Sequence, residues 1–186
     1  MAPGEQTDAD LVRLAQGGDV DAFAEIVRRH ERRLRIVLLR VLDDTRDVEE
    51  AVQDAFVQAW RNLHRYRADA ALFTWLYRIG VNAALGRARR RTVATVELSV
   101  VEGRAHDPGT DHDPAAAAEA ADLRSRVLAA LAELPFEYRE AVVLRDLAGL
   151  SNAEVAAALG IGIAAAKSRV HRGRMQLRDR LEPDLP

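Results

Sequence analysis

Length, composition and charge exclude several classes of protein. The chain has 186 residues, enough for one or two domains, and it contains no cysteine. Disulfide frameworks, thiolate metal sites, cysteine nucleophiles and thiol switches are therefore excluded. The formal net charge is -2, from 27 Lys and Arg against 29 Asp and Glu, which argues against a uniformly basic nucleic-acid coat. The longest uncharged apolar stretch, residues 155–166, is shorter than the roughly 20 residues that span a bilayer. The acidic first residues do not resemble a secretory signal, so we expect a cytoplasmic protein.

The first half of the chain has the periodicity of helices. Apolar residues recur at three- and four-residue spacing, whereas the alternation of a half-buried strand is nearly absent. Asp19 is placed to cap a helix that runs to about residue 42. Further helices are predicted for residues 45–63 and 71–91, the latter ending in a run of arginines. The predicted fold class is all-α.

A change of composition divides the chain. Residues 95–120 are rich in Pro, Gly and Asp and show no convincing helical period, which predicts a flexible acidic linker. Pro114 is able to open an alanine-rich helix, so the end of the linker is not sharply defined. We therefore expect two small helical domains, residues 1–94 and 121–186, joined by this linker.

The last third of the sequence predicts a helix-turn-helix. One helix is stopped by Pro135, and another follows to about residue 147. Ser151 and Glu154 form a capping box at the start of a short helix, and Gly160 is placed to end it in a left-handed conformation. A basic helix, residues 164–181, comes next. A short helix, a glycine turn and a basic helix are the pattern of this DNA-binding motif.

Residues 164–181 contain six Lys and Arg and a single acid, which points to an anionic polymer as the partner. On the basic run alone, a solvated helix is an equal alternative; the capping box and turn before it favour DNA. The start of such a helix faces base edges in the major groove, and four residues occupy it: Lys167, Ser168, His171 and Arg172. Arg174 and Arg178 are better placed for phosphates.

Aromatic residues and arginines occur together between residues 64 and 91. Flat side chains stack on unpaired bases while arginines follow the backbone, a combination that holds single-stranded nucleic acid. The aromatic residues concerned are Tyr66, Phe73, Trp75 and Tyr77. For Phe73 and Trp75 a place in the core is the simpler interpretation. Asn82 has the donor and acceptor for a base edge, but many helical asparagines have no such role.

Acidic side chains concentrate between residues 43 and 54, with Arg46 the one basic interruption. This surface cannot contact DNA. It is either solvated, the usual case, or it docks on a basic protein surface. Combined with the two basic segments, it indicates a protein that bridges DNA and another protein.

In this order the motifs resemble the extracytoplasmic-function (ECF) group of bacterial RNA polymerase sigma factors, which belong to the sigma-70 type. Residues 47–60 are similar to the family's core-polymerase-binding helix. Residues 73–79, with Asn82 and Arg89–Arg90, are similar to its promoter-melting segment. The second DNA-binding domain is matched by Leu134–Pro135, Arg139, Gly149–Ser151, Glu154–Ala156, Leu159–Gly160, Lys167–Arg169 and His171–Arg174.

The resemblance implies an initiation factor made of sigma regions 2 and 4. It implies core RNA polymerase (the clamp helices of the largest subunit and the flap), promoter DNA and an anti-sigma protein as partners, with no cofactor and no membrane insertion. The residues implied in polymerase binding are Asp47, Glu50, Gln53 and Asp54. Those implied at the minus-10 element are Arg78, Asn82, Arg87, Arg89 and Arg90. Those implied at the minus-35 element are Lys167, Ser168, Arg169, His171, Arg172 and Arg174.

Two departures from the family pattern bear on promoter recognition. Gly86 replaces a usual aspartate, and Ala164–Ala166 replace a usual Gly-Thr-Val at the entry of the basic helix.

The main alternative function is that of a helix-turn-helix regulator that binds duplex DNA without polymerase. This alternative leaves the acidic segment and the aromatic-arginine segment unexplained. An enzyme has little support, because the five histidines lack metal-ligand spacing and no phosphate loop or Ser/His/Asp motif is present. No catalytic and no metal-binding residues are expected.

Overall fold

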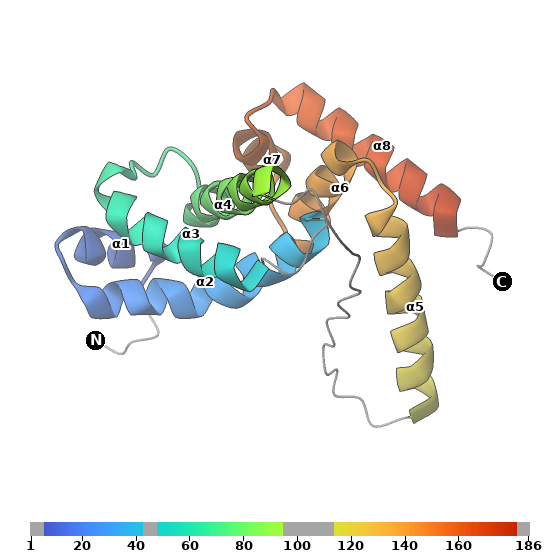
Figure 1. The fold of residues 1–186 in the computed structure, drawn as a ribbon, viewed down its shortest axis with the longest axis horizontal. Coiled ribbons are helices and arrows are strands. Elements are labelled where there is room, and N and C mark those ends of the chain that lie inside the picture. The colour runs from blue at the N-terminus through green and yellow to red at the C-terminus, as the bar shows by residue number, and fades with distance from the viewer. Residues whose placement is uncertain (1–5, 43–47, 95–113, 182–186) are drawn as a thin grey trace.

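The computed structural model describes residues 6–42, 48–94 and 114–181, and these ranges are helical without a β-strand (Figure 1). The all-α class is therefore confirmed. In chain order the elements are α1 (Asp8–Gln16), α2 (Val20–Val41), α3 (Val48–Asn62), the 3-10 turn η1 (Leu63–Arg65), α4 (Leu72–Ala94), α5 (Pro114–Ala132), α6 (Phe136–Val142), the π-helical turn η2 (Val143–Leu147), α7 (Asn152–Leu159) and α8 (Ile163–Leu181). We call α1–α4 the N-terminal half and α5–α8 the C-terminal half.

Local capping starts the first two helices. The Asp19 carboxylate accepts a hydrogen bond of 3.0 Å from the amide of Ala22, as predicted. The helix α1 was not predicted from the periodicity, although its capping box is visible in the sequence. Thr7 Oγ1 accepts from the Asp10 amide at 3.2 Å, and Asp10 Oδ2 accepts from the Thr7 amide at 3.1 Å.

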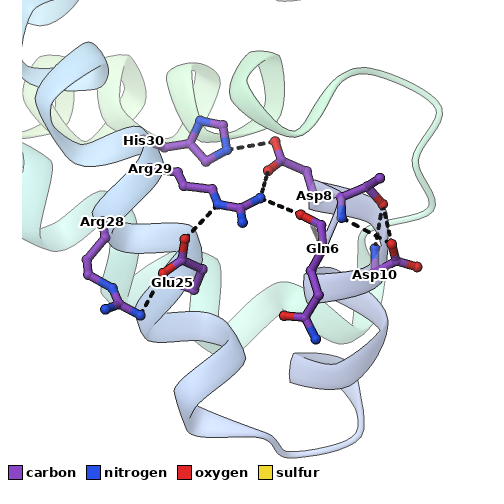
Figure 2. A network of polar contacts seen from close by, with 8 residues as sticks. Gln6, Asp8, Asp10, Glu25, Arg28, Arg29 and His30 are labelled. Carbon is purple, nitrogen blue, oxygen red and sulfur yellow. Dashed lines mark hydrogen bonds and ion pairs between the residues drawn. The ribbon is translucent and has the colours of Figure 1, made fainter. Parts of the chain in front are cut away.

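A polar network fastens α1 to α2 (Figure 2). His30 is buried, and its Nε2 lies 2.8 Å from Asp8 Oδ2. Arg29 donates to the Gln6 carbonyl at 2.7 Å and to Glu25 Oε1 at 2.8 Å, and its guanidinium lies 3.5 Å from Asp8 Oδ1. Hydrogen bonds from Arg29 hold the pKa of the Glu25 carboxyl below its usual value. The network therefore joins the short helix α1 to the long helix α2.

The helices α2, α3 and α4 pack around a core of aliphatic side chains. Leu34, Leu38 and Leu76 are fully buried. Gly80 of α4 lies where a Cβ would be 3.1 Å from Leu38 Cδ1, so the small residue permits the close approach of α4 to α2. The buried faces of these three helices thus form the core of the N-terminal half.

The predicted helix-turn-helix is present in the C-terminal half. Ser151 Oγ accepts from the Glu154 amide at 3.2 Å, and Glu154 Oε2 accepts from the Ser151 amide at 2.8 Å. Gly160 ends α7 with φ at 66°, the left-handed conformation that glycine adopts without strain. The helix α8 then crosses α6 at Gly173, where an added Cβ would lie 2.5 Å from Val142 Cγ2.

The two halves pack against each other rather than standing apart (Figure 1). Helix α7 lies on α4, and α6 and η2 lie on α2, so that one cluster of buried side chains extends through both halves. Most of the predicted linker, residues 95–113, lies outside the described residues; its last part, residues 114–120, is the start of α5. The start of the predicted second helix, residues 45–47, also lies outside them.

Candidate nucleic-acid and polymerase interfaces

One side of α8 is available to a large partner. Lys167, Ser168, His171 and Arg172 are exposed, whereas Ala166, Val170 and Gly173 are buried on the opposite side. Lys167 and His171 are four positions apart, as are Ser168 and Arg172, so the four side chains lie on a single face of the helix. The structure therefore brings together the four residues that were expected to face base edges.

Two further arginines of α8 already have carboxylate partners. Arg169 lies 3.2 Å from Glu137 of α6. Arg174 donates from Nε to Asp146 Oδ2 at 3.0 Å, and hydrogen bonding to Asp146 raises the pKa of Arg174. Exposed ion pairs of this kind contribute little free energy. Exchanging the carboxylate for a DNA phosphate therefore costs little, and both residues remain compatible with phosphate contact.

The candidate minus-10 face of α4 lies against α7. Arg78 donates from Nε to the carbonyl of Ala158 at 3.3 Å and from its terminal nitrogen to the carbonyl of Ala157. Asn82, one helical turn further on, is exposed and lines a cavity of about 290 Å³ that Gly160 also borders. Arg87, Arg89 and Arg90 belong to α4, but their side chains lie outside the described part of the chain.

The aromatic residues near this face divide into two groups. Phe73 is 3 % exposed and Tyr77 is 1 % exposed, so neither presents a ring to a base in this arrangement. The core interpretation of Phe73 is confirmed, and the interpretation of Tyr77 as a stacking residue does not fit the structure. Trp75 and Tyr66 are half-buried and pack on each other, with ring centroids 5.1 Å apart.

The predicted acidic face lies on α3. Glu50 and Gln53 are exposed and Asp54 is half-buried, while Asp47 lies outside the described residues. The opposite side of the helix is buried in the core of the N-terminal half. Beside the acidic face the structure adds an exposed apolar surface that sequence reasoning missed: Val57 and Trp60 are exposed, and the Trp60 ring packs 4.9 Å from that of Phe23.

Polar links between the two halves were also missed. Arg33 of α2 donates to the carbonyl of Ala148, and its guanidinium lies 3.8 Å from the centroid of the Phe73 ring. Burial lowers the pKa of Arg33. The Tyr77 hydroxyl donates to Glu140 Oε1 at 2.8 Å. No spacing rule connects these residues, because they are far apart in sequence and belong to different elements of the fold.

Neither a metal centre nor a membrane span emerges from the part of the chain that the structure describes. Within residues 6–42, 48–94 and 114–181, no group of three or more His, Asp or Glu side chains is arranged to hold a metal ion. Among the helices described there, none combines the length and apolar character needed to cross a bilayer.

An exposed basic helix at the end of a helix-turn-helix, together with an arginine- and asparagine-bearing helix and an acidic helix, defines a helical DNA-binding transcription factor. Comparison with known families narrows this class. Residues 26–93 match the model described as Sigma-70 region 2, and residues 124–177 match the model described as Sigma-70, region 4.

Individual sigma factors match this chain over nearly its full length. The chain is 32% identical over 183 residues to the ECF RNA polymerase sigma-E factor of Escherichia coli strain K12, covering 95% of each chain. It is 36% identical to the ECF RNA polymerase sigma factor SigE of Mycolicibacterium smegmatis, covering 97% of this chain and 70% of that one. The chain belongs to the ECF family of RNA polymerase sigma factors.

Solved structures show the same fold. CnrH in complex with the cytosolic domain of CnrY matches with a TM-score of 0.70 and 29% identity, covering 96% of this chain and 99% of that one. The sigma factor RpoE in complex with the anti-sigma factor NepR from Bartonella quintana matches with a TM-score of 0.72 and 27% identity. This match covers 89% of this chain and 100% of that one.

Proposed function

We propose that this sigma factor uses three separate surfaces to recruit core RNA polymerase to particular promoters. The acidic face of α3 contacts the polymerase, α4 acts on the minus-10 element, and α8 reads the minus-35 element. The observation that carries the proposal is the exposed face of α8 built from Lys167, Ser168, His171 and Arg172, in a chain that also presents an acidic helix unsuited to DNA. One protein with both surfaces is able to link an enzyme to a DNA sequence.

Polymerase binding is assigned to Glu50, Gln53 and Asp54, together with Asp47, on the clamp helices of the largest subunit. Glu50, Gln53 and Asp54 are three and four positions apart in α3, so they share one side of this helix. Charge complementarity to a basic surface would accelerate association and fix its orientation. The C-terminal half would contact the flap of core RNA polymerase.

Recognition of the minus-10 element is assigned to Arg78 and Asn82, with Arg87, Arg89 and Arg90 following the backbone of the non-template strand. The amide of Asn82 has the donor and acceptor needed for the edge of an extruded base. At the minus-35 element, Lys167, Ser168, His171 and Arg172 would reach base edges, and Arg169 and Arg174 would hold phosphates.

The division of the chain follows from these roles. Residues 1–94 form the polymerase-binding and minus-10 domain, residues 95–120 the linker, and residues 121–186 the minus-35 domain. The chain would act in the cytoplasm, where its template is, and without catalysis of its own, because the polymerase performs the chemistry. An anti-sigma protein is a further expected partner, since RpoE is bound to the anti-sigma factor NepR in one similar structure.

Reconstituted transcription tests the proposal against the helix-turn-helix regulator. Core polymerase plus this chain should produce run-off transcripts from a library of genomic promoters, whereas core polymerase alone should not. If no template is transcribed, the chain does not act as a sigma subunit. A regulator would instead bind duplex DNA tightly in the absence of polymerase.

A charge-reversal pair tests the acidic face of α3. Glu50→Arg combined with Asp54→Arg should abolish co-purification with core polymerase, because it replaces two negative charges by two positive ones on the proposed contact. Asp69→Arg combined with Asp122→Arg makes the same change in net charge at two exposed positions elsewhere and should leave binding intact. Equal binding by the two double variants would remove α3 from the interface.

A further inference from the structure

The basic residues of α8 differ in their partners according to their position around the helix. We call its exposed face the reading face, which is built from Lys167, Ser168, His171 and Arg172. Among the residues that the structure describes, no carboxylate forms an ion pair with Lys167 or Arg172. The two cations that are proposed to reach base edges therefore carry an uncompensated charge.

Two arginines at the edges of the reading face are paired instead. An α-helix turns about 100° per residue, which places Arg174 at one edge of this face and Arg169 at the other. Arg169 lies 3.2 Å from a carboxylate oxygen of Glu137 in α6. Arg174 donates from Nε to Asp146 of η2 at 3.0 Å, and its terminal nitrogen donates to the second oxygen of the same carboxylate. Each edge of the reading face thus has one arginine and one acid from a supporting element.

The two edges are the places where DNA phosphates would lie. A helix in the major groove points one face at the base edges and has a phosphate backbone on either side. Arg169 and Arg174 are therefore placed to meet the two backbones. Glu137 and Asp146 are exposed at the same two edges, so their charges also act on an approaching duplex.

These ion pairs affect two kinds of DNA complex differently. Non-specific binding depends on how many phosphates the cations of a protein neutralise, and a carboxylate beside a guanidinium cancels most of its charge at a distance. In a specific complex, base contacts fix the register, and a phosphate is brought to contact distance of each edge arginine. Exchange of the carboxylate for that phosphate costs little, because exposed ion pairs contribute little free energy.

We propose that Glu137 and Asp146 are specificity-determining residues of the minus-35 domain. Each neutralises an arginine at one edge of the reading face, so that this arginine strengthens binding to the minus-35 element and adds little to binding elsewhere on DNA. Neither acid touches a base, and each acts through the arginine with which it is paired. The inference rests on the proposed role of α8 at the minus-35 element.

The salt dependence of duplex binding tests this inference. Glu137→Gln and Asp146→Asn keep the shape of each side chain and remove its charge. One probe is a duplex that the natural chain selects from a random pool, and the other is a scrambled duplex of the same length and composition. Fluorescence anisotropy across a salt series gives the affinity and the slope of log affinity against log salt for both.

On the scrambled duplex, each variant should steepen the salt slope by about 0.9, because one more phosphate is neutralised. Binding to this duplex should tighten by at most about eightfold at about 0.1 M salt, which is the full effect of one added phosphate contact. On the selected duplex the slope should not change, since the edge arginine already holds a phosphate there. The ratio of the two affinities should therefore fall in each variant.

Two further variants serve as controls. Asp122→Asn removes the same charge from an exposed position of α5 and should leave both slopes as they are in the natural chain. Arg174→Gln added to Asp146→Asn should return the slope on the scrambled duplex to its natural value, because the gain acts through that arginine. A purely structural effect of Asp146→Asn would persist in this double variant. Glu137→Gln tests the opposite edge independently.

The outcomes separate this inference from the proposed function. Unchanged slopes on both duplexes, or an equal change on both, overturn the role of Glu137 and Asp146 while the assignment of α8 stands. A gain on the scrambled duplex that survives Arg174→Gln overturns the role of Asp146. If the natural chain enriches no sequence from the random pool, α8 does not read DNA, and the proposed function fails together with the inference.

Discussion

The phenolic hydroxyl of Tyr77 donates a hydrogen bond of 2.8 Å to Glu140 Oε1, across a separation of 63 residues in sequence. It joins α4, the proposed promoter-melting helix, to α6, which precedes the helix-turn-helix in the C-terminal half. Burial raises the pKa of the Glu140 carboxyl, and it raises the pKa of the Tyr77 phenol well above its usual value. Closure of the two halves is consequently coupled to proton binding.

Closure should weaken as the pH rises above the acid range. In the open state Glu140 has an ordinary pKa near 4.5, whereas the closed state raises it. The closed state therefore binds the proton more tightly, so its stabilisation is complete below pH 4.5 and is lost as the pH rises through the raised pKa. Distances between spin labels at Arg61→Cys in α3 and Ala165→Cys in α8, recorded against pH, should show a growing population with the two halves apart over this window.

Glu140→Gln should flatten that dependence, because a neutral amide cannot titrate. Glu137→Gln should preserve it, since Glu137 is exposed and its change leaves the hydrogen bond between Tyr77 and Glu140 in place. A pH profile identical in the natural chain and in Glu140→Gln would show that the carboxyl of Glu140 does not control closure.

Gly173→Ala should destabilise the C-terminal half. A Cβ at this position would lie 2.5 Å from Val142 Cγ2 and 3.1 Å from the Tyr138 carbonyl, so α8 must move away from α6. Overpacking of this kind costs about 1–3 kcal/mol, and the gain of about 1 kcal/mol in helix propensity does not fully offset it. Denaturant unfolding should show a lower midpoint. Gly162→Ala adds the same methyl group where nothing lies within 4 Å, so it should lower the midpoint less than Gly173→Ala.

Ser151→Ala should lower the free energy of unfolding by about 1 kcal/mol, because it removes the side-chain acceptor at the start of α7. The backbone amide of Ser151, which the variant keeps, is the main cause of the lowered pKa of Glu154, and the Ser151 side chain lowers that pKa further. The side-chain contribution is present above pH 4.5 and is lost as the pH falls through the lowered value. The difference between the natural chain and the variant should therefore shrink in acid. Ser125→Ala, on the exposed side of α5, is the matched control and should be neutral.

Local chemistry explains which parts of the fold were predictable. Asp19 caps α2, and Ser151, Glu154 and Gly160 bound α7, because each acts on backbone groups within a few residues. The same rule applies to Thr7 and Asp10 at the start of α1, but the capping box there precedes a short helix in an acidic segment, and periodicity alone did not indicate it.

The packing of one half on the other was not predictable in this way. Helical periodicity shows that Tyr77 lies on a face of α4, but not whether DNA or another helix covers that face. Tyr77 was grouped with stacking aromatics for this reason, and the structure buries it against Glu140. Arg33 is similar: it is one of several arginines on α2, and nothing in the sequence indicates that its partner is a backbone carbonyl in the other half, that of Ala148.

Acetylation of Lys167 should weaken binding to duplex DNA that carries the minus-35 element. Lys167 is the single lysine of the chain and is exposed on α8, so an amine-directed reagent modifies only this side chain and the N-terminus. Loss of its charge removes one phosphate-neutralising cation, which should reduce the slope of log affinity against log salt by about 0.9. Fluorescence anisotropy across a salt series measures both quantities, and co-purification with core polymerase should not change.

Lys167→Arg is the control for that experiment. It keeps the positive charge and cannot be acetylated by the same reagent, so treatment should leave its DNA affinity and its salt slope as they were. Any loss seen in this variant reports modification of the N-terminus alone. If the natural chain binds the minus-35 duplex equally well before and after treatment, the exposed face of α8 that contains Lys167 is not the surface that contacts DNA, and the assignment of Ser168, His171 and Arg172 is refuted with it.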